Sequence, residues 1–387
     1  MTVPADDQVP RKPLSTREDY RSLLTGEVAL IDVRAPLEFE KGAFAAATNL
    51  PLLSDEERHL VGIRYKEAGQ DEAIELGAAL LDATVRAERV QAWKAFASVN
   101  PNGALYCFRG GLRSRITQAW LAAAGVEWPL VTGGYKALRS FSLESLDRLS
   151  QNLPLALVAG RTGSGKTDLL LRLERHVDLE GRANHRGSSF GGMASDQPTP
   201  VNFENAIAID FLRLEDSCAL APVWLEDEAK LIGRICLPQS LREAMLRAPA
   251  VILETPLDER ISNCTRDYVV DLLARYQSTM GEQKGFDAFA SHHRHSLDRI
   301  KKRFGGERHS QALELLDKAL DAHREHADTS AYGDFIELLL TDYYDPMYDY
   351  QLLSKERSTL ATGDAETLLA FANDYSDGPG VASRVSI

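Results

Sequence analysis

The chain has 387 residues, of which 44% are apolar and 26% are charged, and its formal net charge is −13. These values are ordinary for a soluble globular protein of two or three domains, and no apolar run reaches the roughly 18 residues that a membrane helix needs. The negative charge repels nucleic acid at long range, so a polyanionic partner would require a local basic patch.

Two further features of composition limit the class of protein. The N-terminus is polar and lacks the apolar core of a signal peptide, which predicts a cytoplasmic protein without membrane contacts. The four cysteines stand far apart and form no CxxC pair, which argues against a disulfide framework and a cysteine-based zinc site. We expect Cys218, Cys236 and Cys264 to be inert core residues.

In chain order, residues 1–13 are predicted to form a flexible tail and residues 14–150 a first domain. That domain has apolar strands at Leu30–Val33 and Ala104–Cys107, separated by a helical stretch over Asp71–Ser98. Gln151–Pro154 is a plausible boundary. Strands alternating with helices predict an α/β fold with mainly parallel sheets in this domain and in the next.

The second domain is predicted over residues 151–345. Leu155–Ala159 and Ala250–Glu254 have the pattern of buried strands, and Asp298–Arg324 that of a charged helical stretch broken at Gly305–Gly306. Residues 346–387 are predicted to form a C-terminal extension with a frayed end.

A phosphate-binding motif follows the first strand of the second domain. The segment Gly160-Arg161-Thr162-Gly163-Ser164-Gly165-Lys166-Thr167 matches G-x-x-x-x-G-K-[ST] at every fixed position. Glycines let backbone N–H groups wrap a phosphate, Lys166 would reach its terminal group, and Thr167 could hold Mg²⁺. A chance glycine-rich turn is the alternative, and the flanking strand and leucine-rich helix argue against it.

The loop alone does not identify the phosphate compound. The apolar-to-acidic stretch Val223–Glu228, with Glu226 and Asp227, could end beside the loop, as could Val251–Glu254. Because each of these acids could equally be a solvated strand end, a diphosphate site is better supported than a nucleoside triphosphatase.

A second anion-binding motif lies in the first domain. Cys107 ends a strand and is followed by Arg109-Gly110-Gly111 and a helix that begins near Arg113. Backbone amides and the helix dipole would stabilise a thiolate at Cys107, while Arg109 and Arg113 could hold an oxyanion. This layout is typical of a nucleophilic cysteine that takes a group from an anionic donor, although most free cysteines are buried structural residues.

The cysteine loop, together with Ile31–Phe39, Lys41–Phe44 and Ala47–Leu52, resembles the rhodanese family over about residues 16–140. The resemblance implies a rhodanese-like fold that carries sulfur or selenium on the loop cysteine. Where that family has Gly-His-Ile, this chain has Gly42-Ala43-Phe44. Related phosphatases share the fold and a Cys-x5-Arg loop, which Cys107 and Arg113 also match, so the fold alone does not decide the chemistry.

Taken whole, the chain resembles the tRNA 2-selenouridine synthases, which join a rhodanese-like domain to a P-loop domain. Shared stretches beyond the two loops are Asn184–Gly191, Phe203–Asn205, Trp224–Glu228 and Tyr343–Tyr348. The resemblance implies geranylation of wobble 2-thiouridine in the tRNA anticodon by geranyl diphosphate, followed by replacement of the S-geranyl group with selenium from selenophosphate. It implies no tightly bound cofactor, and a selenophosphate-producing enzyme as a further partner.

Two polar segments are candidates for phosphate or tRNA binding. His185, Arg186, Ser188 and Ser189 surround a glycine turn, with a polar surface loop as the alternative. The densest basic run lies within His292–His309 and comprises Arg294, Arg299, Lys301, Lys302, Arg303 and Arg308. It could bind tRNA phosphates or be a solvated helix face. Four histidines lie there too, without a recognisable metal-ligand spacing.

Tyr343, Tyr344, Tyr348 and Tyr350 could stack on unpaired bases, although ordinary core packing is more frequent for aromatic residues. Two other functions remain open at this point. One is a Cys-x5-Arg phosphatase or sulfurtransferase joined to an ATP-dependent small-molecule kinase. The other is a non-catalytic scaffold gated by an anion or a nucleotide.

Overall fold

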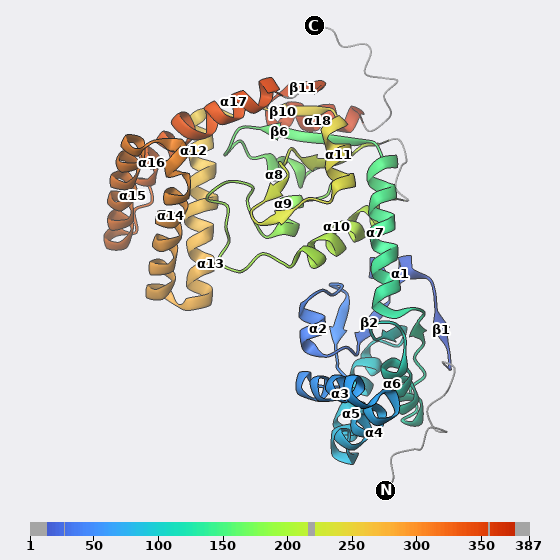
Figure 1. Cartoon of the computed structure of the whole chain (residues 1–387). Helices are drawn as coiled ribbons and strands as arrows, with labels where there is room; N and C mark the ends of the chain where they lie inside the picture. The colour runs from blue at the N-terminus through green and yellow to red at the C-terminus, as the bar shows by residue number, and fades with distance from the viewer. Residues whose placement is uncertain (1–13, 27, 216–220, 355–356, 376–387) are drawn as a thin grey trace. The chain divides into compact units, whose positions relative to one another are not determined.

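The computed structural model describes residues 14–26, 28–215, 221–354 and 357–375 (Figure 1). The chain divides into two compact units. Unit 1 comprises the described residues of Met1–Leu146 and of Thr199–Arg213. Unit 2 comprises the described residues of Asp147–Pro198 and of Leu214–Ile387. The expected flexible tail, the frayed end and Cys218 lie outside the described residues. None of the helices in the described ranges is long and apolar enough to span a bilayer.

Unit 1 contains a five-stranded sheet in the order β1-β5-β4-β2-β3, and every pair in it is parallel. The strands are β1 (Thr16–Arg17), β2 (Ala29–Asp32), β3 (Ala47–Asn49), β4 (Gly103–Tyr106) and β5 (Leu130–Val131). All four residues of the central strand β4 are buried. The predicted strands at Leu30–Val33 and Ala104–Cys107 are therefore present, each shifted by one residue.

Helices follow or connect these strands. They are α1 (Tyr20–Thr25), α2 (Pro36–Glu40), α3 (Asp55–Ala68), α4 (Gln70–Leu80), α5 (Ala83–Val99), α6 (Leu112–Ala123) and α7 (Gly134–Asn152), which continues into unit 2. Ser54 begins α3 with a capping box, in which its hydroxyl accepts from Glu57 N and the Glu57 carboxylate accepts from Ser54 N. The predicted helical stretch Asp71–Ser98 is two helices, because Leu81 and Asp82 end one and cap the next.

Helix α10 (Pro200–Leu214) belongs almost entirely to unit 1 although it lies late in the sequence. Asn202 Oδ1 accepts from Ala43 N, and Asn205 Nδ2 donates to Ala43 O, each at 2.8 Å. A Cβ on Gly42 would stand 2.5 Å from the Val201 side chain. Glycine is therefore required at this turn because α10 packs directly against it.

Unit 2 contains a four-stranded parallel sheet in the order β11-β10-β6-β7. Its strands are β6 (Leu155–Gly160), β7 (Val223–Glu226), β10 (Ala250–Leu253) and β11 (Thr359–Gly363), and a separate hairpin pairs β8 (Leu231–Ile232) with β9 (Ile235–Cys236). The P-loop-type α/β architecture predicted for the second domain fits this sheet. The edge strand β11 lies within residues 346–387, the segment predicted to form a C-terminal extension.

The remaining helices surround this sheet or form a bundle beside it. They are α8 (Lys166–Leu170), α9 (Leu179–Ala183), α11 (Gln239–Arg247), α12 (Leu257–Thr265), η2 (Arg266–Val270), α13 (Asp271–Met280), α14 (Glu282–Phe304), α15 (Gly306–His326), α16 (Tyr332–Leu339), η3 (Leu340–Tyr344), α17 (Asp345–Ser354) and α18 (Ala365–Tyr375). Helices α13, α14 and α15 pack side by side (Figure 1). The predicted break at Gly305–Gly306 is confirmed, since α14 ends at Phe304.

The expectation that Cys236 is a core residue is wrong. Alternation along the two-residue strand β9 buries Ile235 and exposes Cys236. Cys264 on α12 is buried as expected, and burial raises the pKa of its thiol to about 12. Because the thiolate is the reactive form, Cys264 is inert at neutral pH.

Candidate functional site

The loop Gly160–Thr167 connects β6 to α8 and is shaped by its glycines. Gly160, Gly163 and Gly165 have φ values of 155°, 80° and 84°. A Cβ on Gly163 would lie 2.7 Å from Sγ of Cys264, so only glycine fits. Successive backbone N–H groups in such a turn form a concave site for an anion.

Lys166 and Thr167 close the loop. Lys166 Nζ donates to Gly160 O at 2.9 Å and to Arg161 O at 3.2 Å, and thus reaches back over the loop. The Thr167 hydroxyl donates to Glu180 Oε2 at 3.4 Å. Both side chains are therefore held at the place where the motif requires them.

Helix α12 supports the loop from one side. Arg260 Nε donates to Thr162 O at 2.9 Å, and Asn263 Nδ2 donates to Gly163 O at 3.0 Å. The guanidinium of Arg260 also forms two hydrogen bonds with the Asp345 carboxylate, at 2.6 and 3.0 Å, and is almost fully buried. A buried charge pair of this kind is costly to break, because the partner that remains is left uncompensated.

A polar cavity of about 300 Å³ surrounds the loop, and charges of both signs line it. The cations are Lys166, Arg186 and Arg303, which could hold a diphosphate. Arg161, also in the loop, instead forms ion pairs with Asp345 and Asp349. The Ser164 side chain is buried inside the loop.

Two further acids also line this cavity: Glu180, which sequence reasoning missed, and Glu228, which ends the predicted acidic stretch. Burial raises the pKa of Glu228 well above its usual range, and the neighbouring Glu180 carboxylate adds to the shift. Burial also raises the pKa of Glu180, against the opposing charge of Lys166. With the Thr167 hydroxyl they form an all-oxygen donor set, which suits Mg²⁺ bound together with phosphate. The described residues contain no cluster of three or more His, Cys, Asp or Glu positioned to hold a metal ion.

The two acids predicted near the loop lie apart from each other. Asp227 lines the cavity and forms a 2.7 Å ion pair with Arg357. Glu226 does not line it: its side chain is fully buried, and Oε2 accepts from Leu179 N at 3.0 Å, at the start of α9. Glu226 thus holds α9, and Glu228, two residues later, is the acid that lines the cavity. Glu254 is not among the residues that line it.

The predicted polar loop His185–Ser189 lines the same cavity through Arg186, Ser188 and Ser189. Arg186 also forms a 3.1 Å ion pair with Asp267. His185 is buried, and burial, followed by the charges of Arg299 and His292, lowers its pKa to about 4. It is therefore neutral at physiological pH and adds no positive charge.

A groove of about 940 Å³ runs along α14 and shares Gly187, Ser188, Ser189, Arg303 and Tyr343 with the loop cavity. Only part of the predicted basic run lines it, namely Arg299, Lys302 and Arg303. Arg294 and Arg308 form ion pairs with Asp317 and Asp342, and Lys301 lies outside the groove lining. Arg308 belongs to α15. Because residues three and four apart share a helix face, the groove-lining cations form one basic face of α14, and Arg294 and Lys301 lie on another.

The tyrosines predicted as base-stacking candidates differ in their exposure to solvent. Tyr343 and Tyr344 are buried, and Tyr343 packs against Phe304. Tyr350 is 75% exposed. Core packing therefore accounts for Tyr343 and Tyr344, as the base rates for aromatic residues suggest.

The Cys107 loop in unit 1 follows the central strand β4. Cys107 is buried, and its Sγ lies 3.2 Å from the Ser114 hydroxyl. Gly110 has a positive φ of 67°. The thiol therefore sits at the carboxyl end of a parallel sheet, which is where α/β folds place their reactive groups.

The two arginines of this loop differ in their surroundings. Arg113 donates to both carboxylate oxygens of Glu38, at 2.5 and 3.3 Å. Burial raises the pKa of Glu38, but hydrogen bonding and charge from Arg113 outweigh it and lower the pKa overall. Arg109 is exposed, and its guanidinium lies 5.9 Å from the Phe108 ring centroid. Of the two, Arg109 is therefore the one better placed to meet an anion.

A glycine pair that sequence reasoning missed shapes the same loop. Tyr135 N donates to Cys107 O at 2.9 Å. A Cβ on Gly134 would collide with Cys107 O and Gly110 N. Gly133 and Gly134, with φ of 69° and 62°, are thus required for the turn to reach the cysteine loop, and the Gly-Gly dipeptide was the signal for it.

A family profile and full-length relatives that resemble this chain carry the same family description. The profile of the tRNA 2-selenouridine synthase AAA domain matches residues 153–377. A tRNA 2-selenouridine synthase of Marinobacter nauticus is 47% identical over 92% of this chain and 96% of its own length. Those of Hahella chejuensis and Bordetella bronchiseptica are 50% and 47% identical, over 92% and 94% of this chain and 93% and 98% of their own.

Proposed function

The chain belongs to the tRNA 2-selenouridine synthase family, and from this premise we propose that it converts wobble 2-thiouridine in tRNA to 2-selenouridine. The observation that carries the proposal is the extent of the similarity. The alignment with the Marinobacter nauticus relative extends over 92% of the chain and 96% of that relative, so it includes most of unit 1 and most of unit 2.

In the proposed first step, the sulfur of 2-thiouridine attacks C1 of geranyl diphosphate. The C1–O bond breaks, diphosphate leaves, and the uracil ring loses its N3 proton. Lys166, Arg186 and Arg303 support this assignment, since they would compensate the charge that grows on the leaving diphosphate. A Mg²⁺ ion held by Thr167 with Glu180 or Glu228 would add to that compensation.

In the proposed second step, the selenium of selenophosphate forms a bond to C2 and the C2–S bond breaks. Alkylation assists this step, because the sulfur then departs as geranyl thiol. Water cleaves the Se–P bond and releases phosphate, so selenium keeps its oxidation state throughout. We assign Cys107 to the second step as the thiol that meets the selenium donor, with Arg109 nearest to this incoming anion. The thiol at the end of β4 and the exposed guanidinium support this.

We further propose that unit 1 is the rhodanese-like domain expected over 14–150, and that unit 2 is the P-loop domain expected over 151–345. An all-parallel sheet with the cysteine after its central strand supports the first assignment. The pairing of Arg113 with Glu38 weighs against a Cys-x5-Arg phosphatase, because such an enzyme needs its arginine for the phosphate.

The tRNA would bind along the α14 groove, where Arg299, Lys302 and Arg303 supply positive charge beside the loop cavity. The protein would then work in the cytoplasm, with a selenophosphate-producing enzyme as the source of its second co-substrate. Neither step calls for a tightly bound cofactor.

The test is mass spectrometry of nucleosides from thiolated tRNA incubated with the protein, geranyl diphosphate and selenophosphate. The wild-type chain should yield 2-selenouridine, and Cys107→Ala should accumulate S-geranyl-2-thiouridine. Cys236→Ala, which removes an exposed thiol, is the matched control and should behave as wild type. Normal 2-selenouridine from the Cys107→Ala variant would refute the role given to this residue.

A further inference from the structure

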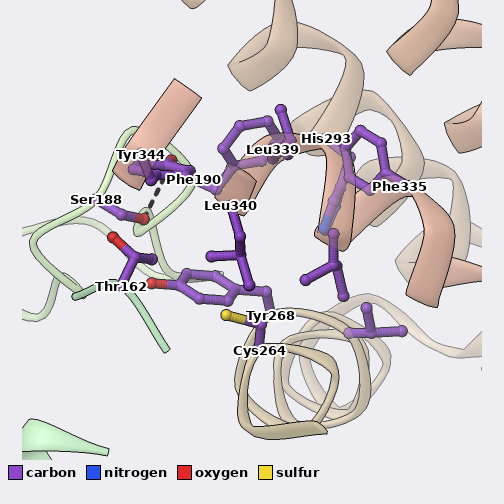
Figure 2. A pocket seen from close by; sticks show the side chains of 12 residues that line it. Thr162, Ser188, Phe190, Cys264, Tyr268, His293, Phe335, Leu339, Leu340 and Tyr344 are labelled. Carbon is purple, nitrogen blue, oxygen red and sulfur yellow. Dashed lines mark hydrogen bonds between the residues drawn. The ribbon is translucent and has the colours of Figure 1, made fainter. Parts of the chain in front are cut away.

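A narrow apolar slot lies in unit 2 between α12–η2 and α16–η3 (Figure 2). Phe190, Phe335, Leu339 and Leu340 form much of its wall. The catalytic steps proposed above use none of these side chains. The slot has a volume of about 30 Å³, a tenth of that of the loop cavity, so it suits a slender chain and excludes a nucleobase.

The slot adjoins the phosphate loop. Four residues, Thr162, Ser188, Tyr268 and Tyr344, line both the slot and the loop cavity. Figure 2 shows Thr162 and Ser188 on one side of the slot and His293 and Phe335 on the opposite side. The slot therefore leads from the phosphate loop towards His293 and Phe335.

The wall of the slot carries no charge at neutral pH. Burial lowers the pKa of His293 to about 3 and raises that of Cys264 to about 12, and it also raises the pKa of Tyr268 and Tyr344. Each shift favours the neutral form of its group. The loop cavity beside it contains Lys166, Arg186 and Arg303. A ligand that occupies both spaces must have an anionic head and an uncharged tail.

We propose that the slot binds the hydrocarbon chain of a prenyl diphosphate whose diphosphate lies in the Gly160–Thr167 loop, and that the depth of the slot, ending at Phe335, selects the chain length. The inference rests on the proposed function, because it takes geranyl diphosphate as the donor. It adds the residues that recognise the chain: Leu340 along the slot and Phe335 at its end.

Burial of apolar carbon predicts the size of the effect. Each buried methylene group strengthens binding roughly fourfold. Geranyl diphosphate, with one isoprene unit more than dimethylallyl diphosphate, should therefore bind at least about tenfold more tightly. Farnesyl diphosphate, with a further unit, should gain nothing if Phe335 closes the slot.

The experiment measures dissociation constants of dimethylallyl, geranyl and farnesyl diphosphate, and of inorganic diphosphate, with the full chain and without tRNA. Phe335→Ala should deepen the slot and improve farnesyl relative to geranyl binding about tenfold. Leu340→Phe should weaken geranyl binding about tenfold and leave inorganic diphosphate unchanged. Phe286→Ala is the matched control, since Phe286 belongs to the same hydrophobic core and does not line the slot.

The outcomes distinguish a failure of the slot assignment from a failure of the proposed geranylation. If geranyl diphosphate binds wild type no more tightly than dimethylallyl diphosphate, the slot does not hold the chain, whether or not tRNA is geranylated. The same conclusion follows if both slot variants keep the wild-type order of affinities while melting cooperatively. If the chain-length order changes as expected but no prenyl group reaches tRNA, the slot assignment stands and the proposed geranyl step fails.

Discussion

The two faces of α14 allow a charge-matched test of tRNA binding. Lys302 and Arg303 line the groove, and within the described residues neither pairs with an acid. Arg294 and Lys301 lie on the same helix outside the groove lining, and Arg294 is paired with Asp317. Changing either pair to alanine removes two positive charges from α14, so long-range repulsion increases equally in both variants.

The expected difference follows from counterion release. Each phosphate contact contributes about 0.7–0.9 to the slope of log affinity against log salt concentration. Lys302→Ala with Arg303→Ala should therefore lower the magnitude of the slope by about 1.4–1.8, for cognate and non-cognate tRNA alike. Arg294→Ala with Lys301→Ala should change it by less than half as much.

Filter binding or fluorescence anisotropy at several salt concentrations would measure both slopes. Equal slopes for the two double variants would refute the assignment of tRNA to the groove. Arg299 is left intact in this design, because its guanidinium donates to Ser189 O and Ser296 Oγ and supports the neighbouring loop.

Two further predictions concern unit 2. Lys166→Ala should slow geranylation about 10–100-fold, because a charge-assisted contact contributes roughly 1.5–3 kcal/mol. The variant should still convert pre-formed S-geranyl tRNA to selenouridine tRNA. Normal geranylation together with failed selenation would show that Lys166 serves the second step instead of the first. Glu226→Gln should change the pH dependence of the free energy of unfolding. In the wild type, burial and then the charge of Asp178 raise the pKa of Glu226, so the folded state favours its neutral form. The wild-type protein therefore loses stability as the pH rises through that pKa, and glutamine, which does not titrate, removes this loss. Urea unfolding at pH 5 and pH 8 should show a smaller loss for the variant than for wild type, and equal losses would contradict this reasoning.

Features that are contiguous in the sequence could be predicted from it. The loop Gly160–Thr167, the cysteine loop and the break before α15 depend on glycines at fixed spacing, and local backbone geometry determines them. The strands at Leu30–Val33, Leu155–Ala159 and Ala250–Glu254 were predicted for a related reason, since short apolar runs between turns are characteristic of buried parallel strands.

Features that depend on side chains distant in sequence could not be predicted. Glu180 reaches the phosphate loop from α9, and the choice of Glu228 over Glu226 depends on where β7 ends. The Glu38–Arg113 pair joins residues 75 positions apart, and α10 returns to unit 1 after β6 has begun unit 2. The error at Cys236 has a simpler cause, because the strand that contains it is only two residues long and gives no periodic pattern to read.

Recognition of the head and of the tail of a prenyl diphosphate would be coupled through α12. Arg260 and Asn263 hold the backbone of the phosphate loop, and Cys264, next in the chain, lines the apolar slot. Thr162 is itself shared, since its carbonyl accepts from Arg260 and it lines both spaces. A substitution on α12 would therefore disturb diphosphate and chain binding together. Phe335 and Leu340 approach the slot from α16 and η3 and do not line the loop cavity, so chain length can be altered there while the diphosphate site is preserved.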